Sequence, residues 1–89
     1  MHTVIIGRRW FQKTYGNTYH SVTVIQDGET VGRVDCAYGY GDQYIQTAHE
    51  LLVGAGKFAG DYGDFCADRL EHRDRYTITV SDVARQKDL

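Results

Sequence analysis

Three of the four histidines, His20, His49 and His72, are the residues best suited to chemistry in this sequence. A histidine beside a carboxylate is a common acid–base pair, because its pKa lies near neutrality. His49 is followed by Glu50, but position 53 is valine, so the pair does not form the zinc-binding pattern His-Glu-x-x-His. The serines and cysteines stand in no recognisable nucleophile motif. We therefore expect no enzymatic activity and no catalytic residue.

Cys36 and Cys66 are the only cysteines. Nothing in the sequence indicates an oxidising compartment, so two reduced, buried thiols are expected in place of a disulfide. A zinc site that uses both cysteines and two histidines is the alternative, although no pair has close ligand spacing. We expect neither a metal nor another cofactor.

A basic and aromatic stretch, Arg8-Arg9-Trp10-Phe11-Gln12-Lys13, is the first candidate binding site. Arginines beside exposed rings can stack on bases and pair with phosphates. They can also anchor a protein interface, in which Trp, Tyr and Arg carry most of the binding energy. In the structural alternative, Trp10 or Phe11 fills the core and the arginines are solvated. Arg8 and Arg9 point to opposite faces of a regular strand, so one of them is expected on an open sheet face.

A glycine-rich corner, Gly39-Tyr40-Gly41-Asp42, precedes the only long predicted helix. Such loops can expose main-chain amides to phosphates. Here Asp42 is expected to cap the helix with its own carboxylate, and no lysine follows as it does in a P-loop. An ordinary capped turn surrounded by tyrosines is therefore favoured over nucleotide binding.

The spacing of apolar residues predicts the secondary structure. Strands are expected over residues 3–11, 19–26, 30–38 and 76–81, a helix over 42–54 and a shorter helix over 64–72. Asp27-Gly28 predicts a hairpin, and we expect a type I turn with Gly28 in a left-handed bulge position. That register places a set of side chains on one core face, namely Val22, Val24, Val34, Cys36 and Tyr38.

The order βββα(α)β predicts the fold class α+β. We expect an antiparallel sheet of about four strands, with one main helix packed on one face and the other face open to solvent. The 89 residues fit one domain, residues 1–89, with a frayed tail over 84–89. The acidic segment from Asp61 to Asp74 is interpreted as a solvated helix face, with a site for a basic partner as the alternative.

The net charge of −2 argues against a strongly basic nucleic-acid-binding protein. No apolar run approaches the length of about 20 residues that a membrane span requires, and the N-terminal residues lack the pattern of a signal peptide. A cytoplasmic protein without a membrane partner is expected.

Several motifs together resemble a family of small uncharacterised proteins encoded by tailed bacteriophages and prophages. They are Arg9-Trp10-Phe11, Tyr15-Gly16-Asn17-Thr18-Tyr19-His20-Ser21-Val22, Tyr38-Gly39-Tyr40-Gly41-Asp42-Gln43-Tyr44, Val80-Ser81-Asp82-Val83 and the closing Lys87-Asp88-Leu89. The resemblance implies a phage accessory protein in the host cytoplasm. Such proteins often bind a host protein or protein complex, and inhibitors of CRISPR or other defence systems are among them.

Two functions remain open from the sequence. The leading hypothesis is non-enzymatic binding to a host macromolecule, most concretely anti-CRISPR-like inhibition of a bacterial defence system. The alternative is a nucleic-acid-binding module that uses the open sheet face. The candidate binding residues are Tyr19, Arg33, Tyr40, Arg9 and Arg8. The partner and the oligomeric state are left open.

Overall fold

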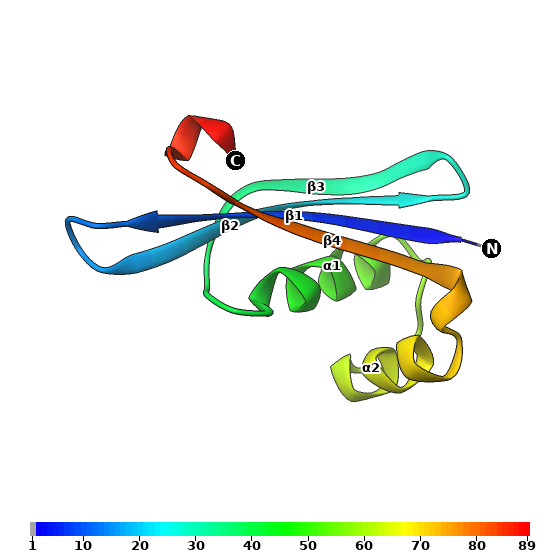
Figure 1. Ribbon diagram of the computed structural model, residues 1–89. Coiled ribbons are helices and arrows are strands. Elements are labelled where there is room, and N and C mark those ends of the chain that lie inside the picture. The colour runs from blue at the N-terminus through cyan, green and yellow to red at the C-terminus, as the bar shows by residue number, and fades with distance from the viewer. Residues whose placement is uncertain (1) are drawn as a thin grey trace.

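The structure is a computed structural model that describes residues 2–89, in which two helices lie on one face of a sheet (Figure 1). Its elements are β1 (Thr3–Gln12), β2 (Asn17–Gln26), β3 (Glu29–Tyr38), α1 (Gln43–Gly54), α2 (Tyr62–Glu71) and β4 (Tyr76–Val83), with 3₁₀ turns at Arg73–Arg75 and Gln86–Asp88. The strand order is β3-β2-β1-β4. The predicted α+β class is therefore confirmed.

One strand pair departs from the expected antiparallel sheet. β1 pairs with β2 antiparallel but with β4 parallel, in a register that runs from Thr3–Tyr76 to Trp10–Val83. β3 and β4 form the two edges of the sheet. Between them the chain crosses one face of the sheet as α1 and α2 (Figure 1). That long crossover permits a parallel pair, which a tight hairpin cannot form.

The core lies between the sheet and α1. Its buried apolar residues are Ile5, Val22 and Val24 from the sheet, Tyr44, Ile45, Ala48 and Leu52 from α1, and Phe65 from α2. Gly7 lies between the strand residues of the core and shows no bulge. An added Cβ at Gly7 would lie 2.5 Å from a carbon of the Tyr44 ring. The glycine in β1 therefore permits the close approach of α1 to the sheet.

The turn between β2 and β3 differs from the prediction. Gly28 has φ of +83°, as expected, but Asp27 also has positive φ, at 52°. Positive φ at both central residues is typical of a type I′ turn, which pairs Gln26 directly with Glu29.

The register of β2 and β3 then shifts twice. One irregularity between Val24 and Ile25 leads to the expected pairing of Val22 with Val34. A second, between His20 and Val22, pairs Tyr38 with Tyr19. Cys36 and Tyr38 are consequently exposed, so their predicted placement in the core is wrong.

The two helices begin in different ways. Asp42 occupies the N-cap position of α1, but its side chain makes no capping hydrogen bond, so the predicted carboxylate cap is absent there. α2 instead begins with a capping box, in which Asp61 accepts from the amide of Asp64 and Asp64 accepts from the amide of Asp61. These two members of the acidic segment therefore stabilise the helix that carries them.

A third acidic residue of this segment also has a structural partner. Asp68 accepts a hydrogen bond from the hydroxyl of Tyr76. Burial and this hydrogen bond raise the pKa of Tyr76, which keeps the phenol protonated as the donor. Asp68 thus links α2 to the first residue of β4.

Candidate binding surface

An aromatic row crosses three strands on the sheet face away from the helices. We define it as Trp10, Tyr19 and Tyr38, which are direct cross-strand partners in β1, β2 and β3. The ring centroids of Trp10 and Tyr19 lie 5.7 Å apart, and those of Tyr19 and Tyr38 lie 5.8 Å apart. Neighbouring aromatic side chains stabilise a sheet through such pairs, and their outer surfaces remain available to a ligand.

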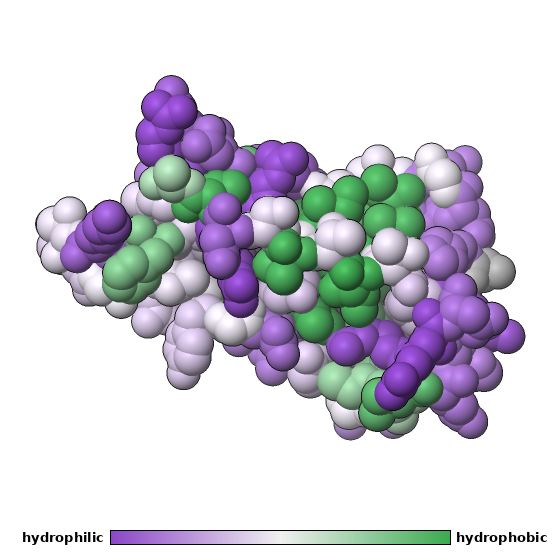
Figure 2. Space-filling view, in the orientation of Figure 1, coloured by the Kyte–Doolittle hydropathy of each residue, from purple (hydrophilic) through white to green (hydrophobic). Residues whose placement is uncertain are grey.

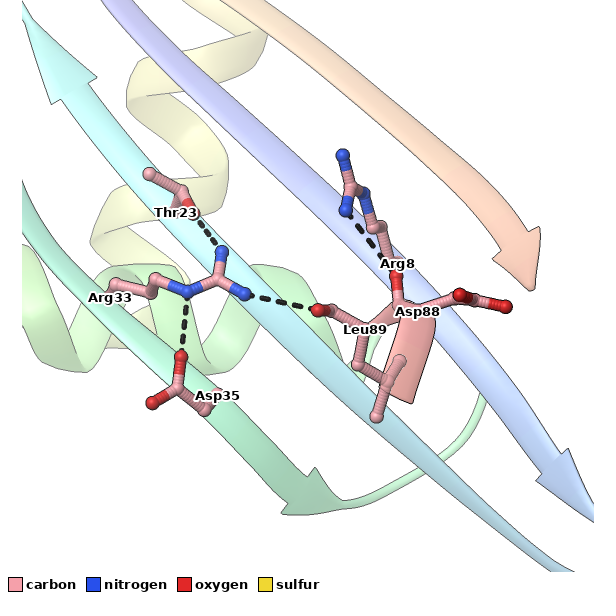
Figure 3. Close-up of polar contacts among 6 residues, drawn as sticks. All are labelled: Arg8, Thr23, Arg33, Asp35, Asp88 and Leu89. Carbon is pink, nitrogen blue, oxygen red and sulfur yellow. Dashed lines mark hydrogen bonds and ion pairs between the residues drawn. The ribbon is translucent and has the colours of Figure 1, made fainter. Parts of the chain in front are cut away.

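Arg8 and Arg33 lie on the same open face (Figure 3). The Arg8 guanidinium donates to the main-chain oxygen of Asp88 at 3.3 Å, and that of Arg33 donates to the main-chain oxygen of Leu89 at 3.2 Å. Arg33 also donates to Thr23 Oγ1 and to Asp35.

The tail therefore has an ordered arrangement where the sequence predicts fraying over 84–89. Gln86–Asp88 forms a 3₁₀ turn that lies over the open face (Figure 1), and the two arginines hold it there. Arg8 and Arg33 were predicted to bind a partner, but in this structure each guanidinium already donates a hydrogen bond to the tail.

Exposed aromatic side chains gather at one end of the molecule. We define the aromatic end as Phe11, Tyr15, Tyr38 and Tyr40, which are 54%, 73%, 64% and 76% exposed. The β1–β2 hairpin carries the first two, and the β3–α1 corner carries the others. The Gly39 amide donates to the Thr18 carbonyl opposite Phe11, which brings hairpin and corner together. Exposed apolar groups gathered in this way are typical of an interaction site.

Tyr40 stands between two hollows. One, of about 510 Å³, lies between the corner, Gln46 of α1 and Tyr62 of α2. The other, of about 400 Å³, is lined by Phe11, Arg9 and Asp82 among others. A partner that packs around the Tyr40 ring can therefore fill a recess on either side of it.

Arg9 lies on the helix side of the sheet, opposite to Arg8. Its guanidinium donates to Asp82 at 2.9 Å and to the Gly41 carbonyl at 3.3 Å. An ion pair with an exposed carboxylate contributes little to stability, about 0–1 kcal/mol. The main role of Arg9 in this geometry is to hold the corner against the end of β4.

The structure thus divides the predicted site residues between two faces. Tyr19, Arg8 and Arg33 share the open face, and Tyr19 is half-buried inside the aromatic row. Tyr40 and Arg9 instead line the hollow that also contains Phe11 and Asp82.

The sequence interpretation missed Tyr15 and Tyr38 as binding residues, and it considered Trp10 and Phe11 only as part of the basic and aromatic stretch, with one of them in the core as the alternative. Neither Trp10 nor Phe11 belongs to the core, since Trp10 is half-buried on the open face and Phe11 is exposed. The parity of β1 would have placed Trp10 with Arg8, but the irregularity that turns Tyr38 outward has no signal in the sequence.

The histidines do not form a shared site. His20 is buried and its ring contacts the Thr47 hydroxyl at 2.8 Å and the Gly39 carbonyl at 3.4 Å. His49 packs among aromatic rings and bonds the Gly60 carbonyl, whereas His72 lies near Asp68. Within residues 2–89, no group of three or more His, Cys, Asp or Glu side chains is placed to hold a metal ion. None of the helices in that range has the length and apolar character needed to cross a membrane.

Comparisons with protein-family models, with curated proteins and with solved structures found no match to this chain. The function must therefore be argued from the geometry of the surface.

Proposed function

We propose that this chain is a non-enzymatic binding protein that recognises a bacterial protein through its aromatic end. The observation that carries the proposal is the grouping of four aromatic side chains that are all more than half exposed, namely Phe11, Tyr15, Tyr38 and Tyr40. Three of them, Phe11, Tyr38 and Tyr40, line two adjoining hollows. Tyrosine and other aromatic side chains dominate the energetics of protein interfaces when they enter recesses of the partner.

The most concrete form of this function is a phage accessory protein that inhibits a bacterial defence system. The motifs that resemble phage and prophage proteins support that setting. Small size suits an inhibitor that acts by covering a surface of a larger machine. The proposal requires no reactive group, which agrees with the structural roles of His20 and His49.

Binding should depend on single aromatic anchors. The partner is captured from a bacterial lysate treated with nuclease, purified, and titrated against the alanine variants of Phe11, Tyr38 and Tyr40. At least one variant should weaken binding by about 2 kcal/mol, or some thirtyfold in Kd. Each should melt close to the wild type, because exposed side chains contribute little to stability.

Val53→Ala is the matched control, since Val53 is also exposed but lies on α1, outside the aromatic end. Wild-type affinity in all three aromatic variants would contradict the proposal. So would an equal loss in the Val53 variant.

A second function, binding of single-stranded nucleic acid, is favoured by one observation. The aromatic row shares the open sheet face with Arg8 and Arg33. A nucleic acid strand that displaced the tail from these arginines would meet stacking rings and cations on one face, which suits exposed bases and phosphates. Trp10 is the only tryptophan, so its fluorescence reports directly on stacking in that row. Quenching by a labelled oligonucleotide, with an affinity that falls steeply as salt rises, would support this function over protein binding.

A further inference from the structure

The two edges of the sheet are protected to very different degrees. β3 carries the charged residues Glu29, Arg33 and Asp35, and its pairing with β2 is irregular in two places. Charges and bulges of this kind prevent a further strand from pairing with an edge. β3 is therefore a closed edge.

β4 has none of these protections over Thr77–Ser81. The segment reads Thr-Ile-Thr-Val-Ser, without charge or proline, and its pairing with β1 is regular from Tyr76 to Val83. Its outer edge presents main-chain N–H and C=O groups in strand geometry. Such an edge is a ready template for another strand.

Apolar surface continues from the β4 edge onto α2. Val80 of β4 is 38% exposed and Leu70 of α2 is 66% exposed. Figure 2, in which β4 runs across the front as in Figure 1, shows hydrophobic residues gathered over that strand with hydrophilic ones around them. A strand added beside β4 would cover both side chains.

A hollow of about 330 Å³ at the start of β4 combines apolar and basic groups. It is lined by Leu70, Tyr76 and Ile78 together with Arg69 and Arg73. The buried Nε of Arg69 has no hydrogen-bond partner among the described residues. An entering strand with an apolar residue followed by a carboxylate would match this hollow in shape and in charge.

We propose that the occupant is the β4 strand of a second copy of this chain, paired antiparallel about a two-fold axis through Thr79. In this register Ile78 lies opposite Val80 of the second copy, on the helix side. Asp82 of the second copy lies opposite Tyr76, beside Arg69 and Arg73, and the relation is repeated by symmetry. The Asp82 carboxylate of each copy thereby reaches the hollow of the other copy that contains Arg69 and Arg73.

Charge and side-chain pairing select this register. A shift that centres Ile78 on the axis places Asp82 opposite Asp74 of the other copy, which is repulsive. A shift that centres Val80 places Asp82 opposite Ile78 and buries a carboxylate against an apolar side chain. Both alternatives keep the helices on the same side of the extended sheet, so they are the relevant competitors.

Sedimentation of the intact chain from about 1 µM to about 1 mM, the range of weak associations, measures the dimer directly. The mass should rise from 10.1 kDa to twice that value with concentration. Thr79→Lys and Thr79→Glu should each remain monomeric, because identical charges meet at the axis. An equimolar mixture of these two variants should restore the dimer through the Lys–Glu pair.

Thr30→Lys is the matched control. Thr30 is likewise an exposed threonine on the open face, but it lies on the β3 edge. This variant should dimerise like the wild type. Arg73→Glu should weaken the dimer about tenfold or more, while Lys13→Glu in the distant β1–β2 turn should leave it unchanged.

The outcomes separate this dimer from other occupants. A wild-type chain that stays monomeric at the highest concentration overturns the proposal, as does a dimer that persists in Thr79→Lys. Failure of the Lys and Glu variants to associate when mixed overturns the register. Circular dichroism confirms that each variant is folded. Loss of the dimer in the Thr79 or Arg73 variants leaves the proposed function of the aromatic end untouched, because neither residue lines the two hollows at that end.

Discussion

His20 ties the β3–α1 corner to α1 from inside the molecule. Its Nδ1 contacts the Gly39 carbonyl and its Nε2 contacts the Thr47 hydroxyl, which also donates to the Gln43 carbonyl within α1. Burial lowers the pKa of His20 from its ordinary value of 6.5, and this cause outweighs the Gly39 contact, which raises it. A residue type that suits acid–base chemistry therefore positions the corner that carries Tyr40.

The free energy of unfolding should decrease as the pH falls below about 6.5, the ordinary pKa of histidine. In that range the unfolded chain takes up a proton at His20 while the folded ring resists it, so protonation favours unfolding. Urea unfolding at pH 7.5, 6.5 and 5.5 checks the trend. His20→Gln should flatten it, whereas His72→Gln should preserve it. Equal slopes in the wild type and the His20 variant would contradict this role.

Among the elements, β1 and α1 come into close contact at Gly7. Gly7→Ala should destabilise the protein by about 1–3 kcal/mol, because the new Cβ would overlap the Tyr44 ring at 2.5 Å and force it to move. Gly54→Ala is the matched control at the end of α1, where an added Cβ meets nothing within 4 Å. That change should stabilise by about 0.5–1 kcal/mol, through the higher helix propensity of alanine. Thermal melts of the two variants test this prediction. Similar changes in Tm for Gly7→Ala and Gly54→Ala would show that Tyr44 does not approach β1 closely.

The elements also show how far sequence reasoning reaches. The strands and α1 follow from local periodicity, and Ala48 and Leu52 are buried as their spacing predicts. The parallel pairing of β4 depends on where a long crossover places the chain, which no local pattern encodes.

The binding surface was predictable only in part. Strand parity predicts Tyr19 on the open face and one of Arg8 and Arg9 beside it, and the structure places Tyr19 and Arg8 there. Tyr38 does not follow from parity, because two shifts of the β2–β3 register decide which face it occupies. The engagement of Arg33 by the tail is equally non-local, since it joins residues 56 positions apart.

At the scale of the whole molecule, the two proposed interfaces use different anchors and share Asp82, which lines the hollow beside Tyr40 and lies at the end of β4. The aromatic end belongs to the β1–β2 hairpin and the β3–α1 corner, whereas the dimer uses β4 and α2. A dimer would therefore present two aromatic ends at once. A partner with repeated sites would then bind more tightly to the dimer than to the Thr79→Lys monomer, because the second contact is intramolecular.

The stability of the molecule should also be uneven along the hairpin. Residues 11–18 include no buried side chain, and the hairpin extends beyond the helices in Figure 1, whereas Ile5, Val22 and Val24 are fully buried in the middle of the sheet. Segments with few buried contacts open locally at a small cost in free energy, while the core opens only with global unfolding.

Hydrogen exchange measured across a series of low denaturant concentrations distinguishes the two kinds of opening. The amides of residues 11–18 should exchange rapidly, at rates that hardly depend on denaturant. The amides of Ile5 and Val24 should exchange only through global unfolding, so their rates should rise with denaturant as unfolding does. Equal protection at both ends of the hairpin would mean that the aromatic end is as rigid as the core, and its side chains would then meet a partner without any prior ordering.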